Sequence, residues 1–189
     1  MIEISEQDLS RCADGDPGAL HRIYDRFADR IYRTALHVMG QSADAEDVVQ
    51  DLFLGLPAKI SSFGGRSRVS TWLYRMTVNH CLNALAKRRR MPATSGGGDD
   101  LDEFGSDFAS PLAIVEQRDA QARCRELLGR LTERDRAILV LREIEELSYR
   151  EIADVLDVPA GTVMSRLARA RQRFGEVVDR ADRSQEVNR

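Results

Sequence analysis

The sequence predicts an all-α protein with two small helical domains joined by a flexible acidic linker. Apolar residues recur at steps of three and four along most of the chain, which is the spacing of one helix face, and no stretch alternates at a period of two as a strand would. A segment rich in Gly, Pro and acidic residues interrupts this pattern near the middle. We therefore expect an extension at residues 1–15, domains at 16–92 and 112–178, a linker at 93–111 and a tail at 179–189.

The apolar stripes give each helix its approximate bounds. Gly55 and Pro57 lie near the end of the second stripe, and because proline lacks an N–H and clashes with the preceding turn, this helix is expected to end early or kink. The stripes predict helices at about residues 20–38, 43–60, 70–90, 112–128 and 132–144, and two short helices across residues 148–175.

The predicted linker has a composition that favours flexibility. Residues 91–111 read MPATSGGGDDLDEFGSDFASP, and such a segment buries too little apolar area to offset the entropy lost on ordering. The 20 residues from Pro92 to Pro111 span at most roughly 65 Å when extended. This length is close to two turns of B-DNA at about 34 Å each. Two domains joined in this way could contact sites nearly two turns apart.

Charge is strongly segregated along the chain, although the net charge is only −3. Residues 61–92 contain 7 Lys and Arg and no Asp or Glu, whereas residues 93–120 contain 1 Arg and 7 acidic residues. Residues 161–189 carry a net charge of +3. A carboxylate-free basic stretch is typical of a surface that binds a polyanion such as nucleic acid. A merely solvated charged face is the alternative at this point.

The composition, 42% hydrophobic and 31% charged, is that of an ordinary soluble protein. The sequence has no apolar run of about 18 residues, and its acidic start lacks the features of a signal peptide, so we expect a cytoplasmic protein without membrane insertion. Cys12, Cys81 and Cys124 are odd in number and far apart. We interpret them as reduced, partly buried thiols, and we expect no metal and no other cofactor.

The segment from Tyr149 to Leu167 has the pattern of a helix-turn-helix motif. Ala153 is small where a second helix must cross closely, and residues 157–161 (DVPAG) form the turn. On the following helix, Val163, Leu167, Ala170 and Phe174 fall on one side, and Ser165, Ala168, Arg169 and Gln172 fall on the other. The second side carries short side chains near the N-terminal end of the helix and a cationic side chain further along, as a helix in a major groove requires. A plain helical hairpin with a solvated, arginine-rich face is the alternative.

The predicted helix at residues 70–90 has an outer face with an aromatic residue, two amides and a basic end. Amides hydrogen-bond base edges, an aromatic ring stacks on an unpaired base, and cations hold phosphates, so this face suits single-stranded or opening DNA. The alternative is that Trp72 is a core residue and that the asparagines are ordinary surface residues. The candidate residues are Trp72, Asn79, Asn83, Lys87, Arg88 and Arg90.

Four segments in order resemble the extracytoplasmic-function (ECF) sigma factors of bacterial RNA polymerase. They are DAEDVVQDLF (44–53), STWLYRMTVNHCLN (70–83), RLTERDRAILVLREIEELSYREIA (130–153) and VPAGTVMSRLARAR (158–171). Together with the apolar stripe before them, the resemblance covers nearly all of residues 16–178. At one position, Met164 replaces the Lys or Arg that is common in the family.

The resemblance implies a mechanism and partners. Residues 16–92 would open the −10 promoter element, where Asn79 and Asn83 lie at positions that read a flipped base of the non-template strand. Residues 112–178 would read the −35 element as duplex, through Ser165, Arg166, Arg169, Arg171 and Arg173. Core RNA polymerase would dock on Asp47, Gln50 and Asp51. An anti-sigma factor is a further expected partner.

Parts of the sequence are also compatible with three other functions. A helix-turn-helix regulator would bind duplex DNA without polymerase and would have no use for Asn79 and Asn83. A sigma-like decoy that sequesters an anti-sigma factor would need no intact reading helix. An enzyme could use His80 and Cys81, but neighbours on a helix point about 100° apart, so we expect no enzymatic activity.

Overall fold

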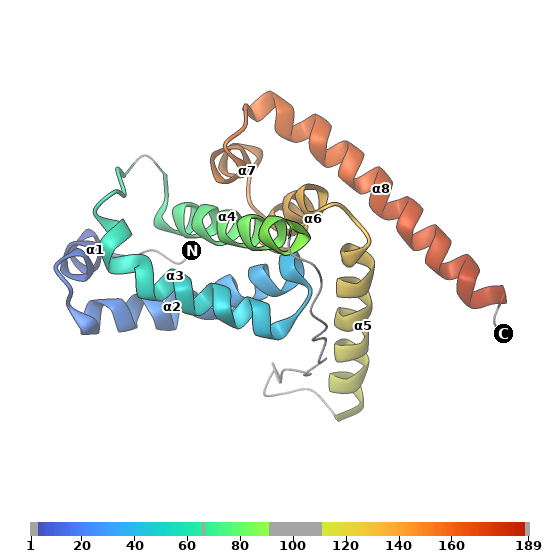
Figure 1. Cartoon of the computed structure of the whole chain (residues 1–189), viewed down its shortest axis with the longest axis horizontal. Coiled ribbons are helices and arrows are strands. Elements are labelled where there is room, and N and C mark those ends of the chain that lie inside the picture. Colours follow the sequence, from blue (N-terminus) through green and yellow to red (C-terminus); the bar gives the residue numbers. More distant parts are fainter. Residues whose placement is uncertain (1–3, 66, 91–110, 188–189) are drawn as a thin grey trace.

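The computed structural model of the chain describes residues 4–65, 67–90 and 111–187, which form eight α-helices and one short π-helical segment (Figure 1). These residues contain no strand, and the all-α prediction is confirmed. Residues 93–110 of the predicted linker lie outside the described part of the chain. The elements are α1 (Glu6–Ala13), α2 (Pro17–Met39), α3 (Ser42–Ile60), α4 (Val69–Arg90), α5 (Pro111–Gly129), α6 (Glu133–Leu139), η1 (Val140–Ile144), α7 (Tyr149–Leu156) and α8 (Ala160–Val187).

The bounds of α2 follow from its sequence. Asp16 is the N-cap, and its carboxylate accepts a hydrogen bond from the Gly18 N–H at 2.8 Å. This bond lowers the pKa of Asp16. Pro17 occupies the first turn, where its missing N–H is harmless. The helix ends at Gly40, whose φ of +86° is costly for any residue with a Cβ.

Helices α3 and α1 of the N-terminal half (α1–α4) compare differently with the predictions. Helix α3 continues through Pro57 to Ile60, which is the end that its apolar stripe predicts, so it does not end early at Gly55 or Pro57. Helix α1 was not predicted. It has 8 residues, of which only Cys12 is buried, so it has no long apolar stripe.

The C-terminal half (α5–α8) also departs from the predicted bounds. The prediction of a short last helix ending near residue 175 is wrong, because α8 continues to Val187. Phe174, Val177 and Ala181 continue the apolar stripe at helical spacing; the first two are half-buried, Ala181 is buried, and α8 contacts α5. The helix predicted at 132–144 is divided into α6 and the π-helical segment η1.

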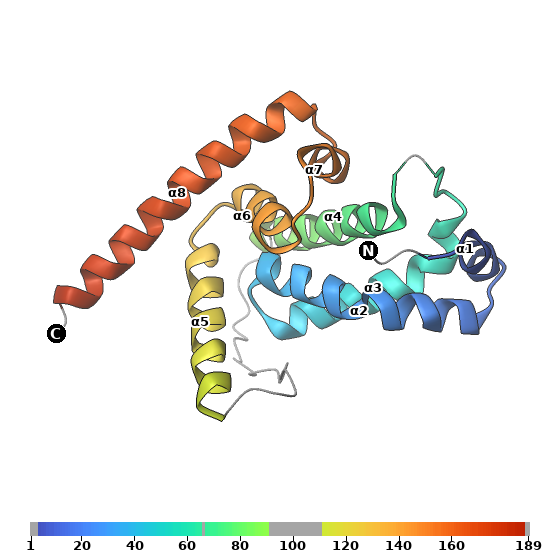
Figure 2. The same ribbon diagram turned by 180° about the vertical axis from the view of Figure 1, so that it is seen from behind.

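The two halves pack against each other, which the sequence did not predict. Figures 1 and 2 show α6 and α7 lying against α4, and one continuous hydrophobic core joins residues such as Phe27 and Ile31 of α2 to Ile138 and Leu141 of the C-terminal half. The packing brings segments more than a hundred residues apart in sequence into contact, for example Thr34 and Glu145. The halves are therefore not held apart in this structure.

Candidate nucleic-acid interface

Helices α7 and α8 form the predicted helix-turn-helix. A capping box begins α7, in which the Ser148 hydroxyl accepts from the Glu151 N–H and the Glu151 carboxylate accepts from the Ser148 N–H. The turn starts at Asp157 in the left-handed region (φ +52°), and Val158 packs against the core. The predicted inner side of α8 is buried or half-buried, and the opposite side (Ser165, Ala168, Arg169 and Gln172) is exposed. The two faces of this helix are as predicted.

The arginines of α8 differ in what they contact. Arg171 is paired with Glu143 at 2.7 Å, and Arg173 is paired with Asp135 at 2.5 Å. Arg166 and Arg169 have no carboxylate partner among the described residues, although the Arg169 Nε donates to the Ser165 carbonyl at 3.2 Å. Both line a cleft of about 650 Å³ that also includes Arg134 of α6 and Leu82 of α4. Of the four predicted −35 arginines, Arg166 and Arg169 are therefore more readily available to bases or phosphates than Arg171 and Arg173.

The outer face of α4 carries the two amide side chains that were predicted to contact DNA, and both are exposed to solvent. Asn79 and Asn83 are exposed, as are Lys87 and Arg90 at the basic end of the helix. Arg88 is engaged differently, because it pairs with Asp44 and donates to the Gln41 side chain at 3.1 Å. The end of α4 therefore offers exposed cations beside two exposed amides.

Trp72 is neither fully buried nor free on this face. Its ring is half-buried and tilts against Phe63, with ring centroids 5.4 Å apart. Phe63 belongs to the loop between α3 and α4. An aromatic residue in a loop is not part of a helical repeat, so the sequence pattern did not indicate that Phe63 would cover the Trp72 ring. Movement of this loop would be needed to expose the Trp72 ring fully.

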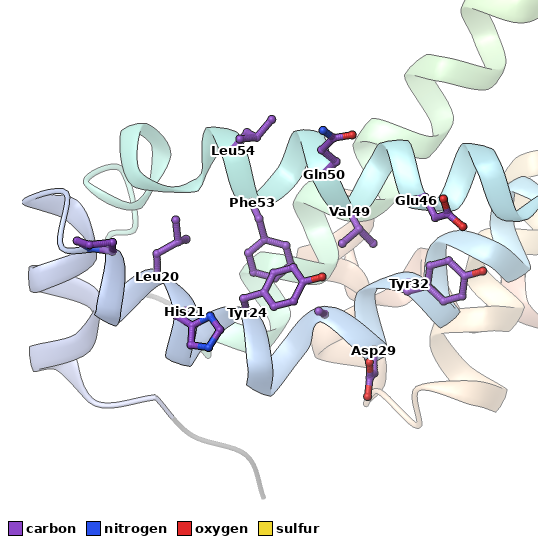
Figure 3. A pocket seen from close by; sticks show the side chains of 12 residues that line it. Leu20, His21, Tyr24, Asp29, Tyr32, Glu46, Val49, Gln50, Phe53 and Leu54 are labelled. Carbon is purple, nitrogen blue, oxygen red and sulfur yellow. The ribbon is translucent and has the colours of Figure 1, made fainter. Parts of the chain in front are cut away.

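Helix α3 presents the residues predicted to contact polymerase beside an apolar groove. Asp47, Gln50 and Asp51 are all exposed, but only Gln50 lines the groove, and Asp51 lies 3.3 Å from the His80 Nε2. Figure 3 shows the groove between α2 and α3, with Leu54 projecting from α3 beside it. The Leu54 side chain is 73% exposed.

The groove is largely aromatic on its floor. The rings of Tyr24 and Phe53 meet edge to face with centroids 4.8 Å apart, and Tyr24 is 45% exposed. Tyr24 falls on the apolar stripe of the helix predicted at residues 20–38, which suggested a buried ring, and the groove was therefore not predicted. The sequence did contain one indication of an exposed apolar surface, namely the consecutive residues Leu52, Phe53 and Leu54. Three consecutive apolar residues on one helix cannot all face the core, so at least one of them must be exposed.

The cysteines are shielded thiols. Cys12 and Cys81 are fully buried, and burial raises the pKa of the Cys81 thiol to about 12. Burial also raises the pKa of Cys12 and of the half-buried Cys124. Cys81 therefore lacks the lowered pKa of a reactive or redox-sensing thiol.

We expect native protein at pH 8 to react with iodoacetamide much faster at Cys124 than at Cys12 or Cys81, because only Cys124 is partly exposed. Mass spectrometry of timed samples checks the order, and the same reaction in denaturant, where all three should react alike, is the control. Rapid native modification of Cys81 would contradict the burial.

The described residues contain no cluster of three or more His, Cys, Asp and Glu arranged to hold a metal ion. None of the described helices is both long enough and apolar enough to cross a bilayer.

The sequence matches two known domain profiles, Sigma-70 region 2 over residues 23–91 and Sigma-70 region 4 over residues 122–174. The RNA polymerase sigma-H factor of Pseudomonas aeruginosa is 32% identical over 185 residues, which is 95% of this chain and 94% of that protein. The ECF sigma factor SigW of Bacillus subtilis is 30% identical, over 91% of this chain and 95% of its own length. The chain belongs to the ECF sigma factors. The ECF sigma-E factor of Escherichia coli, 32% identical over 90% of this chain and 92% of its own length, is a further relative.

Solved structures agree on the fold. CnrH in complex with the cytosolic domain of CnrY superimposes with a TM-score of 0.67 at 23% identity, covering 91% of this chain and 95% of that one. RpoE of Bartonella quintana in complex with the anti-sigma factor NepR gives 0.65 at 22% identity, covering 84% and 96%. This ECF sigma factor is thus a transcription initiation factor that acts with core RNA polymerase at promoters, and it is not an enzyme.

Proposed function

We propose that this sigma factor reads the −35 element as duplex with α8 and opens the −10 element on α4, in the cytoplasm and bound to core polymerase. Exposure of Asn79 and Asn83 on a carboxylate-free basic helix is the observation that carries the proposal. Amides offer a donor and an acceptor to a base edge, which only an unpaired base presents freely. In this assignment residues 16–92 form the −10 domain, residues 112–178 the −35 domain, and residues 93–111 the linker.

The −35 reading is assigned to the exposed side of α8. Ser165 and Ala168 are short enough for the helix to approach base edges, and Arg166 and Arg169 are available to hold guanine or phosphate. Arg171 and Arg173 would hold phosphates after exchanging their present carboxylate partners. Met164 is 64% exposed at the start of this face and would suit contact with a thymine methyl group.

Polymerase docking is assigned to the groove between α2 and α3. An exposed leucine, an aromatic floor and flanking acidic residues resemble a surface on which a partly basic helix would lie. Gln50 lines this surface, and Asp47 and Asp51 lie on its flank, where they would meet basic residues of the polymerase.

An anti-sigma factor is a proposed further partner. RpoE of Bartonella quintana is described as bound to an anti-sigma factor, and CnrH as bound to the cytosolic domain of CnrY. A regulator of this kind would compete with polymerase if it covered the groove between α2 and α3.

The proposal is tested by DNA binding with and without core polymerase. The protein alone should bind promoter duplex poorly, and adding core polymerase should give a salt-sensitive complex in which thymines near −10 become reactive to permanganate. Tight, sequence-specific binding of the free protein without any melting would instead support a polymerase-independent regulator.

Arg169→Ala is expected to weaken discrimination at a single base pair of the −35 element by about 1–3 kcal/mol, because one direct base contact is lost. Competition between duplexes that carry each base at each −35 position measures this. Arg180→Ala, on the same helix but beyond the reading face and paired with Glu176 at 3.8 Å, is the matched control and should change nothing. A uniform loss across all positions would assign Arg169 to a phosphate.

A further inference from the structure

Helices α3 and α4 are joined along their shared edge by two charged contacts. The helices run antiparallel, side by side (Figure 1). Near the start of α3, Asp44 pairs with Arg88, and further along, the Asp51 carboxylate lies 3.3 Å from the His80 Nε2. The two aspartates are seven residues apart and their two partners are eight apart. The contacts are therefore separated by about two helical turns and lie in one row.

The middle of this row carries an acidic residue without a partner. Asp47 lies between Asp44 and Asp51 on α3, and Ala84, which has no charge to offer, lies at the corresponding point of α4. Asp47 is exposed and has no ion-pair partner among the described residues. Of the two acidic residues proposed to meet polymerase, Asp47 is thus free, whereas Asp51 is shared with α4.

The two contacts of the row differ in their dependence on protons. The Arg88 guanidinium stays charged throughout the physiological pH range. An imidazole ring is charged only when it is protonated, and ordinary histidines change state between about pH 5 and 8. The Asp51 side chain is 61% exposed and that of His80 is 35% exposed, against 21% for Asp44. Asp51 is therefore the paired carboxylate of this row that a partner protein can best reach, and a proton on His80 offsets its charge.

Other charged groups lie away from the His80 ring. Asp51 is the one carboxylate within 4 Å of the ring in the part of the chain that the structure describes. On α4 itself, the next charge on this side is Lys87, about 20° around the helix and about 10 Å along it. The remaining elements present their charges to α4 at positions about 120° or more from His80. These groups are Arg30, Arg33 and Glu145 at Tyr74, Asp157 at Arg75, and Glu133 at Arg89.

His80 also borders the amide face of α4. At about 100° per residue, it lies about 60° from Asn83 around the helix, on the same side as Lys87. Asn83 and Lys87 are both exposed. A strand whose base is held by the amides would bring its phosphates to the edge of this face, and a protonated imidazole is a suitable donor to a phosphate. The ring therefore lies between two anions, one of its own chain and one of the DNA.

We propose that His80 is a positioning residue shared between polymerase docking and strand binding. In the free protein, protonated His80 pairs with Asp51. A basic residue of core polymerase takes over this carboxylate, and the released imidazolium then pairs with a phosphate of the opened strand. Because both pairings are exposed, each changes an affinity by only about threefold. The inference rests on the proposed function, which places polymerase at Asp51 and the strand on α4.

The two steps respond to pH in opposite directions. As the pH falls, His80 gains a proton and pairs more strongly with Asp51, so polymerase must displace a stronger competitor and docking weakens. The same proton is required for pairing with a phosphate, so strand binding by the holoenzyme strengthens. A residue that only supported the fold would move both affinities in the same direction.

The test uses the full chain and core polymerase at pH 6 and pH 8. Fluorescence anisotropy measures docking, and binding of the holoenzyme to a promoter duplex premelted at −10 measures strand binding. Relative to His80→Gln, which cannot titrate and so corrects for protons bound elsewhere, the wild type should dock about threefold more weakly at pH 6 and hold the strand about threefold more tightly. His80→Arg, charged at both pH values, should dock weakly and hold the strand tightly at both. Circular dichroism at each pH checks that the fold is unchanged.

Asp51→Asn separates this inference from the proposed function. It should weaken docking at pH 8 and remove the difference in pH dependence between the wild type and His80→Gln. If it weakened docking while the wild type and His80→Gln kept the same pH dependence, the role of His80 would be overturned and the docking site would stand. If it left docking unchanged at pH 8, both would fall. A shift of docking without the opposite shift of strand binding would also overturn the shared role.

Discussion

Replacing Asn79 and Asn83 together by alanine is expected to reduce promoter opening by a factor of ten or more while leaving polymerase binding intact. Both amides are exposed on α4 and have no structural partner among the described contacts, so the fold should not change. Each lost hydrogen bond to an extruded base is worth about 1 kcal/mol or more, and extrusion itself costs a few kcal/mol, which these bonds help to offset.

Permanganate reactivity near −10 measures opening, and co-elution with core polymerase measures recruitment. Gln7→Ala, an exposed amide on α1, is the matched control and should behave as the wild type. Promoters with a premelted mismatch at −10 should rescue part of the defect, because the enzyme no longer has to open the duplex. Equal loss of opening and of polymerase binding would contradict the role assigned to the two amides.

Leu54→Ala is expected to weaken binding to core polymerase about tenfold. The side chain is 73% exposed and adjoins the aromatic groove between α2 and α3, so its truncation should remove contact with a partner without a cavity in the core. Burying a leucine in an interface is worth about 1.5–3 kcal/mol. Fluorescence anisotropy of labelled sigma factor titrated with core polymerase measures the change.

Met164→Ala provides the matched control for Leu54→Ala. Met164 is 64% exposed, lies on α8 far from the groove in sequence, and should leave the polymerase affinity unchanged. An unaltered affinity of Leu54→Ala would mean that polymerase docks elsewhere on the N-terminal half.

Local features were predictable from the sequence because they leave periodic or motif-like signals. The helix-turn-helix is an example, in which the small Ala153, the turn residues and the buried side of α8 all followed from spacing. The exposure of Asn79 and Asn83 followed from the face they share on α4. The end of α8 was missed because Phe174 was taken as the last apolar residue, although Val177 and Ala181 continue its stripe.

The contact between the halves was not predictable for a different reason. Glu145 and Arg136 are charged, and charged residues are rarely buried without a partner, so sequence alone assigns them to the surface. Their partners, Tyr74, Thr34 and the Val38 carbonyl, lie 71, 111 and 98 residues away in the chain. No local pattern encodes such pairs.

Run-off transcription on genomic templates is the most direct test of the central claim, that two reading helices on one chain direct promoter-specific initiation. Core polymerase with this protein should yield discrete transcripts that are absent without it, and the Asn79→Ala/Asn83→Ala variant should lose them. Transcripts that are independent of the protein, or none from any template, would contradict the claim.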